Sequence, residues 1–168
     1  SDLLNQFKEL NIFDENQMNI LRDPIISFKN LPALKKEETK SEISNIKDYF
    51  VAVGRFTKQK NFEFLVKNFI ELRRKYKDIK LIILGDGELL DRITKIVNNE
   101  KLENEILILG FKKNVFKFFS KARALILPSL WEDPGFVIIE AAACNLSIIS
   151  SDCKNGPREI LLDGKAGF

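Results

Sequence analysis

Two cations stand close together where a short apolar run gives way to a helical pattern. Val53-Gly54-Arg55 is followed closely by Lys60. Phosphate oxygens demand positive charge and N–H donors, which Arg55, Lys60 and the start of the next helix would supply without a metal ion. Exposed basic residues are nevertheless the rule, so a solvated loop is the alternative. The spacing alone leaves a diphosphate site and a solvated loop both open.

Two acids, Glu132 and Glu140, bracket the start of a later helical pattern. Phe136 to Ala143 is apolar almost all round apart from Glu140, so this helix is expected to lie deep in the domain. A buried carboxylate needs partners, and Glu140 either pairs with a protein donor or is reserved for ligand hydroxyls. Glu132 precedes a tight Pro-Gly turn that aims it across a pocket mouth beside helix amides. Such a mixture of acceptors and donors suits a sugar.

A glycine turn, Gly85-Asp86-Gly87-Glu88, stands between two further elements. It either brings backbone close to a ligand or is an ordinary strand-to-helix turn. It is neither a dinucleotide fingerprint nor a P-loop, which argues against dinucleotide oxidoreductases and P-loop hydrolases. The chain has no His, so its chemistry must rest on carboxylates, cations and substrate groups.

Short β-branched runs alternate with helical patterns from Tyr49 onward. This alternation predicts an α/β fold, with a Rossmann-like parallel sheet and helices on both faces. Ligands of such sheets bind at the carboxyl edge, where helix N-termini and loop amides collect. Amphipathic stripes predict helices around 62–76, 89–97 and 115–122, besides the apolar 136–143. The expected strands are Tyr49–Val53, Lys80–Leu84, Glu105–Leu109, Ala124–Leu127 and Ser147–Ser151.

The chain divides at about residue 48. Residues 1–48 contain one short helical pattern and a charged stretch at 35–47, and we interpret them as an interdomain segment or linker. Residues 49–168 form the predicted ligand-binding domain. The 168 residues, 45% of them hydrophobic, suffice for one sizeable core. The sequence stops just after a turn at Gly164, so we expect the C-terminal end to be truncated.

Composition narrows the function classes further. The net charge of +3 comes from 27 basic and 24 acidic residues spread along the chain, unlike the basic stripe of a nucleic-acid binder. Cys144 and Cys153 suggest neither a disulfide framework nor a zinc site. No run approaches the roughly 18 apolar residues of a membrane span, and no signal sequence begins the chain. We therefore expect a cytoplasmic protein.

At these motifs the chain resembles the retaining GT-B glycosyltransferases of family 4. Their C-terminal, donor-binding domains have a strand ending in VGR, a nearby Lys, a GxG(E) turn and an E-x7-E motif, in the order found here. The similarity runs from about Asn5 to Phe168, and four ordered motifs are more specific than any one. The resemblance implies the C-terminal domain of a GT-B fold.

The resemblance also implies roles. Arg55 and Lys60 would hold the diphosphate and stabilise the leaving nucleotide, with Glu132 near the sugar's reacting centre as the third catalytic residue. Glu140 would accept from the ribose hydroxyls. Backbone amides at the start of the following helix would contact sugar hydroxyls and phosphate, and the segment at Gly110, Phe111 and Lys112 would meet the base. The expected donor-binding residues are Gly54, Gly85, Gly87, Phe111, Gly135, Phe136, Val137 and Glu140.

As a whole the resemblance implies a hexosyltransferase of polysaccharide or lipopolysaccharide biosynthesis. Its substrate would be a nucleotide-diphosphate sugar, with a UDP-sugar the first choice, and a glycan or lipid-linked acceptor would receive the sugar with retention. Neither a cofactor nor a metal is expected. The acceptor site would lie on an N-terminal domain of the same enzyme that is absent here, so we expect the isolated chain to be inactive. Peripheral membrane association of the full-length enzyme and a place at the inner membrane surface fit a lipid-linked acceptor.

Departures from the family pattern and two rival functions complete the interpretation. The common E-G-F-G stands here as Glu132-Asp133-Pro134-Gly135, and Pro134 has no N–H to offer a ligand. Asn145 replaces the usual Gly after the helix, and Asn tolerates a left-handed cap. A nucleotide-sugar epimerase of GT-B fold and a non-catalytic nucleotide-binding module are the alternatives. The ordered cations and acids favour transfer over both.

Overall fold

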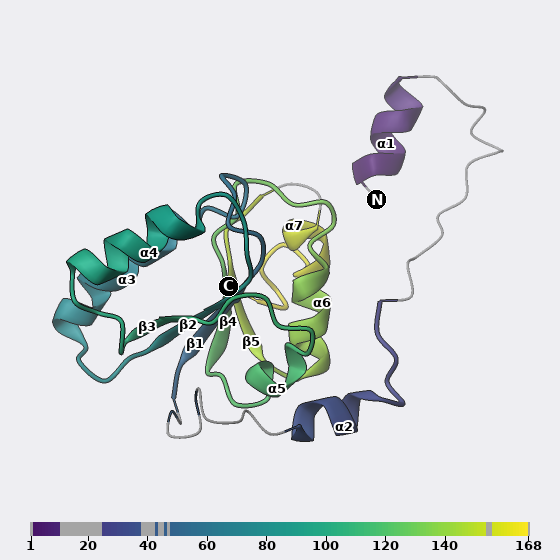
Figure 1. Cartoon of the computed structure of the whole chain (residues 1–168). Coiled ribbons are helices and arrows are strands. Elements are labelled where there is room, and N and C mark those ends of the chain that lie inside the picture. The colour runs from purple at the N-terminus through teal and green to yellow at the C-terminus, as the bar shows by residue number, and fades with distance from the viewer. Residues whose placement is uncertain are drawn as a thin grey trace.

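A computed structural model describes residues 2–10, 25–37, 43, 46, 48–153 and 156–167 (Figure 1). Five parallel strands form one sheet in the order β3-β2-β1-β4-β5. The predicted α/β fold and all five strands are confirmed, with ends that differ from the prediction by one residue at most. The strands are β1 (Phe50–Val53), β2 (Leu81–Leu84), β3 (Ile106–Ile108), β4 (Ala124–Leu127) and β5 (Ser147–Ser150).

The strand order reverses once along the chain. β1 lies in the middle, β2 and β3 extend the sheet to one side, and the chain then returns to place β4 and β5 on the other side. In doubly wound sheets ligands bind outside the carboxyl ends of the strands next to such a reversal. The loops after β1 and β4 therefore flank the expected ligand crevice.

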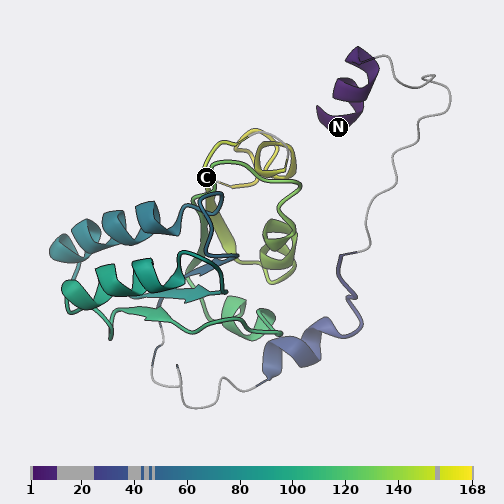
Figure 2. The same ribbon diagram turned by 45° about the horizontal axis from the view of Figure 1, so that its top comes forward.

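Helices α3 (Phe62–Lys75) and α4 (Leu90–Asn99) cover one face of the sheet (Figures 1 and 2). Their buried side chains pack on alternate strand residues such as Ala52 and Ile83, because side chains along a strand point to opposite faces. Phe56, just after β1, meets Phe62 edge-on at a centroid distance of 5.1 Å. The two predicted amphipathic helices are thus confirmed on this face.

The opposite face carries α2 (Leu31–Lys36), α5 (Phe116–Phe119), α6 (Phe136–Ala143) and α7 (Pro157–Ile160). Helix α6 has the predicted bounds, and Asn145 after it has the expected left-handed φ of 56°. Its deep burial was predicted wrongly, because Phe136 is 40% exposed and Ala142 is also exposed. The helix packs on β5, α5 and α7 along one side only, and an all-apolar sequence does not say which side that is.

The N-terminal segment contains α1 (Asp2–Glu9) and α2. Helix α1 lies apart from the sheet, whereas α2 packs against α5 (Figures 1 and 2). Leu31 and Ile43 are buried in the core of the α2 face. Residues interpreted as a linker therefore contribute to the core, although much of the charged stretch at 35–47 lies outside the described residues. The domain division at residue 48 stays a prediction.

Tyr49, one residue before β1, ties the sheet to α5. Its side chain is 1% exposed, and its hydroxyl donates to the carbonyl of Phe118 at 2.7 Å. Burial also raises the pKa of this hydroxyl far above its usual range, so it remains a donor.

We expect Tyr49→Phe to lower the free energy of unfolding by about 1–2 kcal/mol, because a buried carbonyl loses its partner. Urea denaturation followed by circular dichroism measures this change. Tyr76→Phe is the matched control, since Tyr76 is 49% exposed and no hydrogen bond of its hydroxyl occurs among the described residues. Equal effects of the two substitutions would contradict the assignment.

Candidate functional site

A cavity of about 790 Å³ opens at the carboxyl edge of the sheet. The loops after β1, β2 and β3 line it together with one residue of α6. This is where a doubly wound sheet binds its ligands. Six of the predicted site residues line this cavity, namely Gly54, Arg55, Gly85, Gly87, Phe111 and Glu140.

The glycine turn after β2 is packed against the loop after β1. A Cβ on Gly85 would overlap the carbonyl oxygen of Gly54, and one on Gly87 would lie 2.8 Å from backbone atoms of Phe56. The Phe56 amide also donates to the Asp86 carbonyl at 2.8 Å. Both glycines are therefore required by chain packing, as in an ordinary turn. They line the cavity as well, so their predicted contact with a donor stays a prediction.

Arg55 lies two residues beyond the end of β1 and borders the cavity. Its side chain is exposed, and within the described ranges it forms no hydrogen bond or ion pair. A guanidinium presents up to five N–H donors in a planar fork that matches phosphate oxygens. Arg55 is thus a cation at the cavity wall whose donors are available to an anionic ligand.

Glu140 lies in the middle of α6 and reaches the same cavity. It is half-buried rather than enclosed, and no side chain or backbone donor in the described part of the chain bonds to its carboxylate. Of the two options that the sequence left open, pairing with a protein donor is not seen. Burial raises the pKa of the Glu140 carboxyl above its ordinary value of 4.5, because the charged form is partly desolvated.

The raised pKa of Glu140 predicts a pH-dependent stability difference. Its contribution to folding is full below the pKa of the unfolded state and is lost as the pH rises through the folded pKa, where the desolvated carboxylate ionises. Glu140→Gln stays neutral, so we expect the variant to be more stable than the wild type at pH 7. The difference should shrink as the pH falls from above the folded pKa toward 4.5, and it should stay nearly constant below that pH. Urea denaturation of both proteins at each pH measures it, and a constant gap would contradict it.

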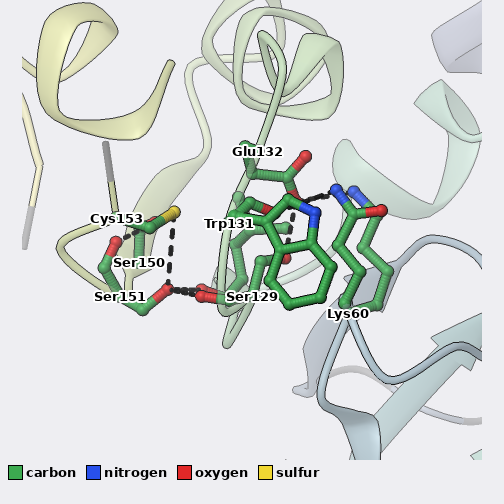
Figure 3. Close-up of polar contacts among 9 residues, drawn as sticks. Lys60, Ser129, Trp131, Glu132, Ser150, Ser151 and Cys153 are labelled. Atoms are coloured by element: carbon green, nitrogen blue, oxygen red, sulfur yellow. Dashed lines mark hydrogen bonds and ion pairs between the residues drawn. The ribbon is translucent and has the colours of Figure 1, made fainter. Parts of the chain in front are cut away.

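Lys60 and Glu132 form a buried pair beside the cavity rather than in its wall (Figure 3). The Lys60 Nζ lies 2.6 Å from Glu132 Oε1, and the two side chains are only 14% and 3% exposed. The Ser129 hydroxyl donates to the same oxygen at 2.5 Å. The aliphatic chain of Lys60 covers Gly54, which does line the cavity. Sequence reasoning assigned Lys60 and Glu132 to different ends of a ligand and missed Ser129.

The loop after β1 is also tied to the loop after β4. The Gln59 side chain donates to the Trp131 carbonyl at 2.9 Å, and the Asn61 side chain donates to the Pro128 carbonyl at 3.2 Å. The Leu130 amide returns a bond to the Gln59 carbonyl at 2.8 Å. These bonds bring the two predicted halves of the site together. Trp131, in the second of these loops, is half exposed.

The start of α6 lies next to Glu132. Gly135 has a φ of 83°, in the left-handed region, and a Cβ there would be 3.5 Å from the Glu132 side chain. Phe136 is exposed and Val137 is buried. Neither these residues nor Gly135 line the cavity. Their predicted contact with a donor sugar stays a prediction.

Four residues give the cavity its polar rim and its aromatic wall. Phe111 is 76% exposed, as expected of a residue that meets a flat ligand. Lys113 adds a positive charge and Asp86 a negative one at the rim. Phe116 is partly exposed and lines the cavity as well. Polar rim and aromatic wall together suit a ligand with a ring and a charged group.

Neither a metal cluster nor a membrane span is found in the described part of the chain. Among those residues no group of three or more acidic or Cys side chains is placed to hold a metal ion. The same residues contain no helix long and apolar enough to cross a membrane. That the ligand binds without a metal stays a prediction.

Comparison with known proteins gives concordant matches. Residues 35–168 match the family described as glycosyl transferases group 1. An uncharacterised glycosyltransferase of Methanocaldococcus jannaschii is 42% identical over 82% of this chain and 34% of its own length. The Campylobacter jejuni N-acetylgalactosamine-N,N'-diacetylbacillosaminyl-diphospho-undecaprenol 4-alpha-N-acetylgalactosaminyltransferase is 35% identical over 73% of this chain and 33% of its own length. The chain thus spans about a third of these relatives.

A solved structure of a Staphylococcus aureus TarM mutant, in complex with Fondaparinux, alpha-GlcNAc-glycerol and UDP, has the same fold. Its TM-score is 0.70 at 24% identity, over 99% of this chain and 31% of that one. At this identity the likeness establishes the architecture, which is that of the C-terminal domain of a GT-B protein.

Proposed function

Since the chain belongs to the glycosyl transferases of group 1, we propose that it is the donor-binding domain of a retaining hexosyltransferase. The whole enzyme would move a sugar from a nucleotide-diphosphate sugar to a glycan or lipid-linked acceptor. The acceptor would bind to an N-terminal domain outside this chain. The observation that carries the proposal is the cavity in which Arg55 and Glu140 stand together without protein partners among the described residues.

Each end of the cavity suits one part of the donor. Arg55 lies where the diphosphate would reach the loop after β1, and its charge would stabilise the negative charge that develops as the anomeric bond breaks. The Glu140 carboxylate would accept hydrogen bonds from the two ribose hydroxyls. These bonds would replace the ones that it makes to water in the free protein. Phe111 and its neighbours would take the base. The proposed nucleotide therefore spans the loops after β3 and β1.

The buried pair would serve the sugar and the reacting bond. The Nζ of Lys60 has three donors and gives one to Glu132, so two remain for a diphosphate oxygen. Glu132 would then face the sugar from the start of α6. We propose that the acceptor's proton passes to a phosphate oxygen of the donor and that attack comes from the leaving group's own face, a mechanism that fits a chain without His. Retention follows from that geometry.

UDP is the first nucleotide to test, because the S. aureus structure was solved with UDP. We expect UDP and a UDP-sugar to raise the melting temperature of the chain in a concentration-dependent way. Isothermal titration calorimetry with UDP, GDP, ADP and their sugars identifies the base. The same titration with EDTA should give the same affinity, as expected of a metal-free site. If no nucleotide in the panel binds, the proposal fails.

A further inference from the structure

Glu132 receives two hydrogen bonds on one oxygen. Ser129 Oγ and Lys60 Nζ both lie within 2.6 Å of Oε1. The other oxygen, Oε2, lies on the side of Gly135 at the start of α6, and in the described residues it accepts no hydrogen bond. The carboxylate is thus held through one oxygen, and the second has no protein donor among the described residues (Figure 3).

Lys60 and Ser129, the two donors to Glu132, differ in whether they would also bind the donor substrate. Under the proposed function the two remaining donors of Lys60 serve the diphosphate, and this second anion would compete with Glu132 for the charge of Lys60. Ser129 is 1% exposed, and the proposed function assigns it no contact with the diphosphate. A carboxylate that is only 4% exposed is strongly destabilised when left without donors. The Ser129 hydroxyl therefore provides a hold on Glu132 for which the diphosphate does not compete.

We propose that Ser129 is a positioning residue, whose hydroxyl holds Glu132 toward the donor's sugar while Lys60 engages the diphosphate. The inference rests on the proposed function and adds a residue to it. Ser129 touches no substrate itself. It acts on the sugar through Glu132 alone, so removing its hydroxyl should change recognition of the sugar and spare recognition of the nucleotide.

Ser129 is itself held by two neighbouring segments. The Ser151 hydroxyl, just beyond β5, donates to the Ser129 carbonyl. On the other side the next residue, Leu130, is bonded through its amide to Gln59. The backbone at Ser129 is therefore fixed relative to β4, β5 and the loop after β1. Only the side-chain torsion of Ser129 is then left to be ordered when its hydroxyl holds the carboxylate.

The test compares UDP with UDP-N-acetylglucosamine on the 168-residue chain by calorimetry. Ser129→Ala should reduce the affinity gained from the sugar by about tenfold, as for a lost charge-assisted hydrogen bond. Its affinity for UDP alone should stay within about twofold of the wild type. Ser129→Thr keeps the hydroxyl and should restore the gain. Ser147→Ala, on the exposed end of β5, is the matched control.

The outcomes separate this inference from the proposed function. If the wild type binds neither UDP nor UDP-N-acetylglucosamine, both the proposed function and the positioning role of Ser129 are wrong. If Ser129→Ala weakens both compounds equally, or neither, the positioning role is wrong while the donor site stands. If the wild type binds UDP-N-acetylglucosamine no more tightly than UDP, the positioning role is also wrong. Should Ser129→Ala fail to fold, Ser151→Ala tests the same point, with a smaller loss of the sugar's contribution expected and no loss overturning it.

Discussion

Arg55→Ala is expected to weaken binding of UDP to the chain by about 10- to 100-fold. The estimate corresponds to hydrogen bonds between a guanidinium and a phosphate, each worth about 1.5–3 kcal/mol. Arg55 is suited to this role because it borders the cavity and no protein acceptor occupies it in the described structure. Calorimetric titration of the wild type and the variant with UDP measures the loss. Arg55→Lys should give an intermediate value, since charge remains but the fork is lost.

Lys58→Ala is the matched control for the Arg55 experiment. Lys58 is an exposed cation of the same loop that does not line the cavity. Both substitutions remove one positive charge from the same region, so they change long-range attraction alike. A larger loss of UDP affinity in Arg55→Ala than in Lys58→Ala would therefore report a direct contact between Arg55 and the diphosphate. Equal losses from the two variants would show that Arg55 contributes only general charge.

Lys60→Ala is expected to lower the free energy of unfolding by about 3–5 kcal/mol. The reason is that Glu132, whose side chain is 3% exposed, would lose the cation that offsets the cost of its burial. Urea denaturation with linear extrapolation gives the value. Replacing both partners, as Lys60→Met with Glu132→Leu, should recover most of the loss, because no buried charge is then left unpaired.

Lys67→Ala provides the comparison for Lys60. Lys67 also lies 2.8 Å from a carboxylate, that of Glu63, but its side chain is 59% exposed. A surface pair one helical turn apart is worth about 0.3–0.5 kcal/mol. If Lys60→Ala cost no more than Lys67→Ala, water would have to reach Glu132, and the buried pair described above would be wrong.

The fold was largely predictable because local pattern and architecture agree here. β2 is buried at all four positions, and its run Leu81–Leu84 has the continuous apolar character typical of a central parallel strand. Helix α3 alternates buried and exposed positions over 14 residues, enough to define a period. The short helices α2 and α7 were not predicted, since six and four residues are too few to show a period. Their positions depend on tertiary packing.

Six of the predicted site residues line the cavity, but the contacts that the predicted residues make with one another were not foreseen. Glu140 was expected to be enclosed and is half-exposed at the cavity, whereas Glu132 was expected at a pocket mouth and is buried. The rule that a buried carboxylate needs partners was sound, and applied to Glu132 it would have pointed to a nearby cation. The partner, Lys60, is 72 residues away in sequence. Only the adjacency of β1 and β4 brings the two together.

The carboxylate of Glu140, which no protein donor satisfies in the described chain, sets two kinds of selection against each other. A laboratory search for heat-resistant variants would remove this acid, because the folded protein gains from its loss at neutral pH. A search for variants that still bind the ribose of a nucleotide would keep this acid. In a library selected for heat resistance, we therefore expect substitutions at position 140 to be the first that abolish nucleotide binding.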